Sequence, residues 1–132
     1  MVELKDLIKF DDWKKEKHVP VIRLQKDVVK KGEYFEVEVS VGKEIPHPNT
    51  TEHHIRWIVL FFMPENEEFP YQVARVEFNS HGESVAGPNT STVYTDHTVK
   101  VNFKTEKHGT ILASSYCNIH GLWQSSKNIS VK

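Results

Sequence analysis

The sequence lacks the cysteine pairs, the long apolar runs and the excess of basic residues that mark three large classes of protein. Its single cysteine, Cys117, cannot form a disulfide within the chain. The 17 Lys and Arg residues are balanced by 18 Asp and Glu residues, and a net charge of -1 offers no positive field to nucleic acid. No apolar run approaches the roughly 18 residues of a membrane span, and the first ten residues lack the uninterrupted apolar core of a secretion signal. We therefore expect a soluble, cytoplasmic protein with no nucleic-acid or membrane partner.

The composition that is present indicates one globular domain. Hydrophobic residues make up 38% and charged residues 27% of the 132 residues, which is typical of a chain that folds around its own core. Single domains usually contain about 100–150 residues. We therefore expect residues 1–132 to form one domain.

Strand-like patterns run through most of the chain after Pro20. In residues 35–41, Phe and Val alternate with Glu and Ser, which predicts a strand with one buried face. Residues 54–63 are apolar on both faces beyond Arg56, as expected of a central strand that is covered on each side. Further strands are predicted at residues 21–22, 71–78, 92–103, 110–116 and 128–131.

The first 15 residues differ from the rest, because their apolar positions fit a short helix or an irregular segment. Its candidate buried residues are Leu4, Leu7, Ile8 and Trp13. Several short strands separated by turns, without helical periodicity after residue 15, predict an all-β protein with an antiparallel β-sandwich or barrel. A functional site is expected in the loops at one end of such a scaffold.

Cys117 and His120 form a C-x-x-H pair directly after an apolar strand. A thiolate and an imidazole at this spacing can reach one metal ion. A lone cysteine also occurs as a small buried apolar side chain, so the pair by itself leaves both interpretations open.

A second group of candidate ligands lies in the loop that contains His47, His53 and His54. Prolines near these residues restrict the backbone, which favours a preorganised ligand set. His53 and His54 are adjacent, so their side chains would point to opposite faces of the following strand and at most one can enter a common site. The alternative is that these are exposed loop histidines that titrate normally.

His18 stands directly before another strand, where it can either ligate a metal or pack against Trp13. Together, four histidines in loops or at strand ends and one cysteine supply enough donors for a transition metal with one position left open. The remaining histidines are predicted to lie at the surface: His81, His97 and His108.

Four separated segments resemble one known family. EKHVPVI, HPNTTEHHI, HGESVAGPNT and SYCNIHGLW occur in this order between about Trp13 and Trp123. Together they resemble the superoxide reductases of the neelaredoxin type, which are the single-domain form of the desulfoferrodoxin family.

This resemblance implies one mononuclear non-haem iron per chain, cycling between Fe(II) and Fe(III), which reduces superoxide by one electron to hydrogen peroxide. It implies equatorial imidazoles and an axial thiolate, and it selects His53 over His54. It also implies an immunoglobulin-like fold of roughly seven strands, a rubredoxin-like electron donor and a homo-oligomer, with a tetramer favoured and a dimer as the other possibility. The implied ligands are His18, His47, His53 and His120 in the plane and Cys117 on the axis.

Two residues next to His18 are the candidate catalytic residues. The ammonium of Lys17 can attract superoxide and offset the charge that develops during its reduction. The resemblance implies that Glu16 is a further iron ligand in the ferric form only, released on reduction.

Two other kinds of metal protein use similar donors. A cupredoxin-like electron-transfer protein would use the same C-x-x-H pair, but it needs an axial methionine after the second histidine, and the only methionines are Met1 and Met63. A zinc-stabilised, non-enzymatic domain would close a tetrahedral site with Cys117 and three histidines, which leaves the fifth donor without a role.

Overall fold

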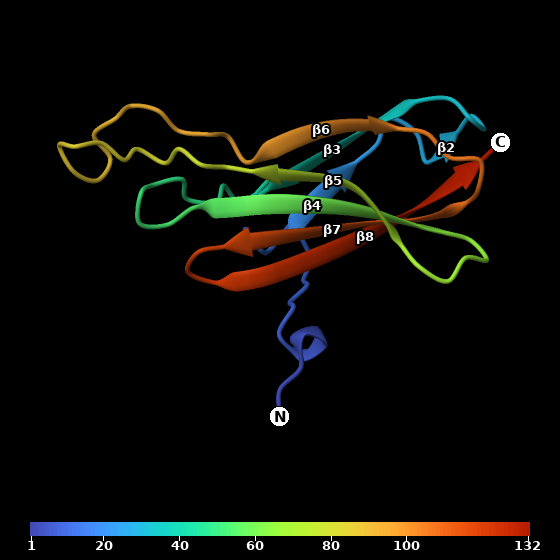
Figure 1. Cartoon of the computed structure of the whole chain (residues 1–132), viewed down its shortest axis with the longest axis horizontal. Coiled ribbons are helices and arrows are strands. Elements are labelled where there is room, and N and C mark those ends of the chain that lie inside the picture. The colour runs from blue at the N-terminus through green and yellow to red at the C-terminus, as the bar shows by residue number, and fades with distance from the viewer.

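A computed structural model describes all residues, 1–132, and its regular secondary structure consists almost entirely of strands (Figure 1). The elements in chain order are the 3-10 turn η1 (Leu4–Asp6) and the strands β1 (Pro20–Arg23), β2 (Val28–Val29), β3 (Phe35–Val41), β4 (Ile55–Pro64), β5 (Tyr71–Glu77), β6 (Thr98–Phe103), β7 (Gly109–Cys117) and β8 (Gly121–Val131). The predicted all-β class is confirmed. No helix in the structure is long and apolar enough to cross a membrane.

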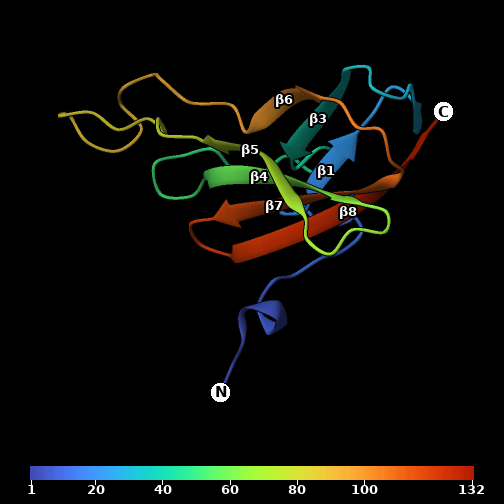
Figure 2. The same cartoon turned by 45° about the vertical axis from the view of Figure 1, so that its right-hand side comes forward.

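The strands form two sheets that face each other (Figures 1 and 2). One sheet has the order β1-β3-β6 and the other β2-β8-β7-β4-β5. All pairings are antiparallel except the short one between β2 and β8. There are eight strands instead of roughly seven, because the two-residue strand β2 had no pattern long enough to predict it.

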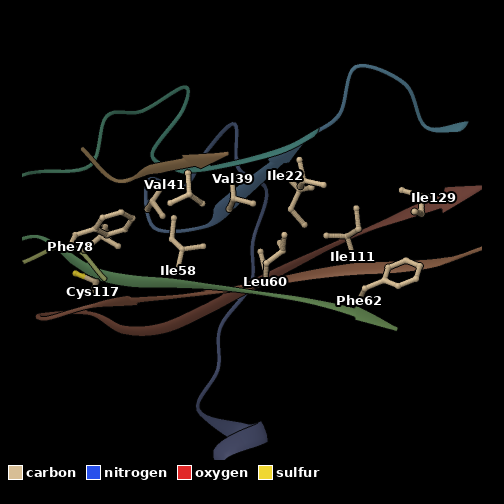
Figure 3. Close-up of a cluster of buried hydrophobic side chains, with 14 of the residues drawn as sticks. Ile22, Val39, Val41, Ile58, Leu60, Phe62, Phe78, Ile111, Cys117 and Ile129 are labelled. Carbon is tan, nitrogen blue, oxygen red and sulfur yellow. The ribbon is translucent and has the colours of Figure 1, made fainter. Parts of the chain in front are cut away.

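The core lies between the sheets (Figure 3). On β3 the valines at 37, 39 and 41 are buried while the residues between them are partly exposed, as the alternation predicted. The facing sheet contributes Ile58, Leu60 and Phe62 from β4 and Ile111 from β7. Burial of these apolar side chains supplies the main driving force that holds the sheets together.

Three segments differ from the prediction by more than one residue. The N-terminal segment forms only the turn η1, and Leu4 and Leu7 are 61% and 51% exposed because no other part of the chain covers them. Strand β6 begins at Thr98 instead of 92, since Thr92 adopts a left-handed φ of 66° that breaks an extended strand. Strand β8 begins at Gly121, seven residues earlier than predicted (128 - 121). The prediction missed the first half of the strand because that half is rich in polar residues.

One end of the sandwich gathers the loops that carry the candidate ligands. The loops at residues 42–54 and 79–97 project from the end at which β7 turns into β8, on the left in Figure 1. The turn is tight: Cys117 pairs with Gly121, whose φ of 81° favours glycine. The segment before β1 reaches this end as well, because His18 contacts His120.

Candidate metal centre

Four of the predicted ligands converge on one point. The ligand atoms of His18, His47, His53 and Cys117 all lie within 4.8 Å of one another. They come from three separate parts of the chain: the residues before β1, the loop between β3 and β4, and the end of β7. The fold therefore brings together a thiol and three imidazoles that the sequence keeps as much as 99 positions apart (117 - 18).

His120, the fifth predicted ligand, borders this group from the turn before β8. Its Nδ1 lies 3.0 Å from Nε2 of His18, 3.2 Å from Nε2 of His53 and 3.8 Å from Sγ of Cys117. Two nitrogens bound at right angles to a metal at about 2.1 Å would be about 3.0 Å apart. The spacings to His18 and His53 therefore fit neighbouring ligands of one ion.

His47 shows most directly that the cluster suits a cation. The residue is 5% exposed, and Nδ1 lies 2.6 Å from the carbonyl oxygen of Pro48. Nδ1 therefore donates, and Nε2 carries a lone pair. That Nε2 is buried without a hydrogen-bond partner. A buried polar atom without a partner is unfavourable, and a bound metal would satisfy it.

Burial keeps these imidazoles in the form that binds metals. It lowers the pKa of His47 to about 3. Burial is also the largest cause of the lowered pKa of His18 and of His53. These rings are therefore neutral at pH 7, and no proton competes with a metal for their lone pairs.

Cys117 also belongs to the hydrophobic core, where it lies at one end of the cluster of buried side chains (Figure 3). It is 1% exposed, and the backbone N–H of His120 donates to its sulfur at 3.4 Å. A backbone N–H that points at the sulfur in this way can orient a sulfur ligand of a bound metal. The donor set of soft sulfur and several imidazoles fits a transition metal such as iron.

Comparison with known proteins identifies the family. The family model described as Desulfoferrodoxin matches residues 10–126, most of the chain. The chain belongs to the desulfoferrodoxin family. It is 59% identical to the superoxide reductase of Pyrococcus furiosus over 92% of this chain and 95% of that protein. It is 54% identical to the neelaredoxin of Megalodesulfovibrio gigas over 96% of this chain and 97% of that one.

Solved structures agree with this membership in the desulfoferrodoxin family. The superoxide reductase (neelaredoxin) of Archaeoglobus fulgidus in the reduced form superposes with a TM-score of 0.88 at 60% identity, covering 94% of this chain and 98% of that one. The resemblance to the neelaredoxin type is thus confirmed over the whole β-sandwich.

Glu16 occupies a different place from the other candidate ligands of this desulfoferrodoxin-family chain. Its carboxylate accepts a hydrogen bond from the backbone N–H of His18 at 2.9 Å and also contacts Nδ1 of the same ring. Burial alone would raise the pKa of Glu16, but its bonds to His18 lower it overall. Glu16 thus holds the outer nitrogen of His18 while Nε2 faces the cluster, and its ligation of ferric iron stays a prediction.

Lys17 is half-buried between Glu16 and His18. Its positive charge is among the lesser causes that lower the pKa of His18 and of His53, so its ammonium acts on the cluster. The ring of His18 stacks on Trp123, with centroids 5.0 Å apart. This contact fixes the ring plane.

Two of the three histidines excluded from the site are less exposed than predicted. His81 is 3% exposed and stacks face to face on His54, with centroids 3.4 Å apart. His97 is half-buried and its ring meets that of His47 edge-on at 5.8 Å. The surface prediction was therefore wrong for both and correct for His108. No local pattern in the sequence signals the burial of His81, because it depends on the stacking against His54.

Proposed function

We propose that this protein is a superoxide reductase, which reduces superoxide by one electron to hydrogen peroxide at a single mononuclear iron per chain. The observation that carries the proposal is the convergence of one thiol and the nitrogens of four imidazoles from separate segments. Relatives at 59% and 54% identity are named superoxide reductase and neelaredoxin, which supports the same activity. When bound, iron would supply the electron by cycling between Fe(II) and Fe(III).

The protein's part is to hold the ion and leave one position for a small anion. His18, His47, His53 and His120 would ligate as neutral rings, and Cys117 would ligate as the one anionic donor. One thiolate against a ferrous ion leaves a formal local charge of +1, which attracts superoxide. The buried sulfur lies where its electron density would reach the metal from the interior.

Lys17 supplies the second attraction. Its ammonium is close enough to influence His18 and His53, and it would draw superoxide to the site and offset the negative charge of the reduced product. Glu16 would orient His18 through Nδ1 in one state and bind ferric iron in the other. For Glu16 to change from one partner to the other, only the short segment that carries Glu16 and His18 needs to move.

Turnover needs an electron from outside the chain, because one iron delivers one electron per superoxide. We propose a rubredoxin-like donor, a cytoplasmic location and assembly into a homo-oligomer, with a tetramer favoured over a dimer. The donor and the assembly follow from the family resemblance, and the location is the one that we expect from the sequence.

The test combines metal analysis with a superoxide pulse. The iron-loaded, reduced protein should contain one iron per chain and form one hydrogen peroxide per electron that it loses. Half a hydrogen peroxide and half a dioxygen per superoxide would instead mean dismutation. The zinc-loaded chain is the control, since it keeps the fold and the charge but has no electron to give; equal activity of both forms would overturn the proposal.

A further inference from the structure

The side chain of Asn118 ties the two ligand-bearing loops together. It follows Cys117, and its amide reaches the segment that contains His53. Its Oδ1 accepts from the backbone N–H of His54 at 2.9 Å, and its Nδ2 donates to the carbonyl of Glu52 at 2.9 Å. One amide thus holds the backbone on both sides of His53.

A third hydrogen bond, from the backbone of Asn118, shows that its side-chain amide takes the place of a backbone group in the β4–β7 ladder. The β4–β7 ladder ends at the pair of Ile55 with Cys117, and one position further the backbone N–H of Asn118 donates to the carbonyl of His54 at 3.2 Å. In a continuing ladder, the return bond from His54 would go to a backbone carbonyl. Here it goes to the side chain of Asn118, so the backbone is free to turn toward His120.

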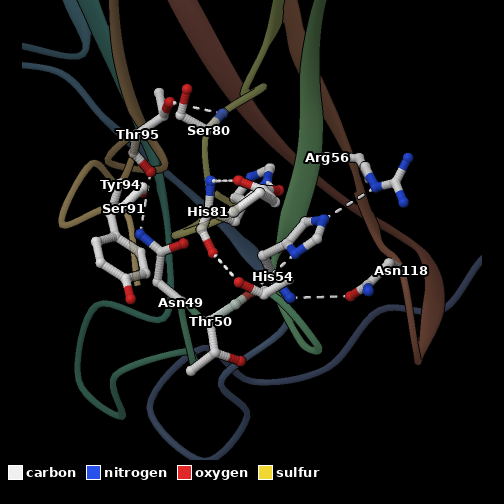
Figure 4. Close-up of polar contacts among 12 residues, drawn as sticks. Asn49, Thr50, His54, Arg56, Ser80, His81, Ser91, Tyr94, Thr95 and Asn118 are labelled. Atoms are coloured by element: carbon white, nitrogen blue, oxygen red, sulfur yellow. Dashed lines mark hydrogen bonds and ion pairs between the residues drawn. The ribbon is translucent and has the colours of Figure 1, made fainter. Parts of the chain in front are cut away.

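His54 gives this connection a fixed attachment point (Figure 4). Its ring is 3% exposed and lies flat against that of His81. Its Nδ1 lies 2.9 Å from the carbonyl of Thr50, and its Nε2 accepts from Nε of Arg56 at 2.9 Å. A ring that is held at both nitrogens and on one face has little freedom to move. The hydrogen bond between the backbone of His54 and the side chain of Asn118 therefore ties Asn118 to a fixed point.

We propose that Asn118 is a positioning residue that sets the distance between the Cys117–His120 turn and His53. The inference rests on the proposed metal centre. The ring of His53 is half-buried and Nε2 lies 3.2 Å from Nδ1 of His120, so small shifts of either loop change the spacing of two ligands. Bonds that orient ligands typically change metal affinity by about 10–100-fold when they are lost.

The alternative is that Asn118 only stabilises the turn. That role would lower the stability of the metal-free fold and leave the ligands of a bound metal unchanged. A positioning role would weaken metal binding and change the spectrum of the bound metal, while the metal-free fold keeps most of its stability. The two roles therefore move different measurements.

The experiment uses cobalt(II) as a coloured probe and compares the natural chain with three variants. Asn118→Ala removes both side-chain bonds, and Asn118→Asp keeps the acceptor for His54 but loses the donor to Glu52. Asn128→Ala is the matched control, because Asn128 accepts a bond from Thr110 at 2.8 Å far along the same β7–β8 pair. Affinity is measured by titration, and the thiolate-to-cobalt absorption band reports the geometry.

We expect Asn118→Ala to bind cobalt(II) about 10–100-fold more weakly than the natural chain and to show a shifted absorption band. The affinity of Asn118→Asp should lie between these two. The control Asn128→Ala should match the natural chain in affinity and in its band. Natural affinity and an unshifted band in both Asn118 variants would overturn the inference. If Asn118→Ala does not fold, Asn118→Asp decides by the same criteria. Failure of the natural chain to bind cobalt(II) through Cys117 would contradict the metal centre itself.

Discussion

Two regions of this molecule lie outside the β-strands, and they differ sharply in how well side-chain contacts hold them. The loops at residues 42–54 and 79–97 bury His47, His54 and His81 and cross-link through side chains. The N-terminal arm, residues 1–12, instead leaves the body of the sandwich (Figure 2). Its Phe10 is 74% exposed, and its backbone bonds to the sheet are those of Lys9 with β8.

The difference lies in the side chains, since neither region has a strand ladder to hold it. The loops are rich in short polar residues whose side chains bond to nearby backbone: Oγ1 of Thr51 donates to the carbonyl of His81, and Nδ2 of Asn49 donates to that of Thr95. The arm alternates apolar residues with long charged ones. Loop order here comes from specific polar contacts, and the arm has few.

The largest effect should come from removing Cys117, the one anionic donor at the end of the sandwich that carries the ordered loops. In Cys117→Ser a hydroxyl replaces the thiolate, so the thiolate charge-transfer band of the iron form should vanish and the reductase rate should fall by about 100-fold or more. Absorption spectroscopy and the superoxide pulse measure the two. A variant that kept both would show that Cys117 is not a ligand.

The second-largest effect should be a loss of folding stability in acid, through the buried histidines of the same loops. The pKa of His47 is about 3 in the fold, against 6.5 ordinarily, so between these values the unfolded chain binds a proton that the folded chain does not. Stability therefore falls as the pH drops below about 6.5, by up to about 1.4 kcal/mol per pH unit for this group. The lowered pKa values of His18 and His53 act in the same direction.

Urea unfolding of the metal-free chain at pH 7 and pH 5 checks this dependence, because this range lies above the ordinary pKa of the carboxylates. The variant His47→Gln is the control and should lose less stability between the two values. Equal losses in both chains would contradict the assignment of the effect to His47.

A smaller effect is expected from Gly82→Ala in the 79–97 loop. A Cβ there would lie 2.5 Å from the hydroxyl oxygen of Tyr94, and the φ of 88° disfavours any other residue. Overpacking of this kind costs about 1–3 kcal/mol. Gly87→Ala isolates the backbone part, since it also has a positive φ of 117° but nothing within 4 Å of its Cβ. Unfolding free energies should therefore fall more for Gly82→Ala, and the opposite order would contradict the packing argument.

The smallest effect should follow removal of residues 1–7 from the arm. The turn η1 buries no residue, and Lys9, which bonds to β8, is retained. The midpoint of urea unfolding of the metal-free chain should change by the equivalent of less than about 0.5 kcal/mol. A much larger loss of unfolding free energy would show that residues 1–7 pack against the sandwich, which would contradict the contrast drawn between the arm and the ordered loops.

The fold was largely predictable where burial alternates along a strand. The pattern at residues 35–41 gave β3 with its bounds, because one face of that strand meets the core and the other does not. The first half of β8 escaped prediction, since Gln124, Ser125 and Ser126 show no apolar face although they pair with β7. Pairing depends on a partner strand that the local sequence does not show.

The same limit applied to the site. The C-x-x-H pair is local and was predictable. His53 and His54 do face different neighbours, His120 and His81, but β4 begins only at Ile55, so the loop separates them and not the strand periodicity that was expected. The burial of His81 was not predictable, because it depends on stacking against His54, 27 positions earlier (81 - 54). The bond of Glu16 to the outer nitrogen of His18 likewise arises from the turn that the chain takes there.

The most direct test of the metal centre is a crystal structure of the iron-loaded protein with anomalous scattering measured at the iron edge. We predict one iron peak per chain, bonded to Sγ of Cys117, to Nε2 of His18, His47 and His53, and to Nδ1 of His120. An iron peak elsewhere, or one without the sulfur of Cys117 among its ligands, would contradict the account.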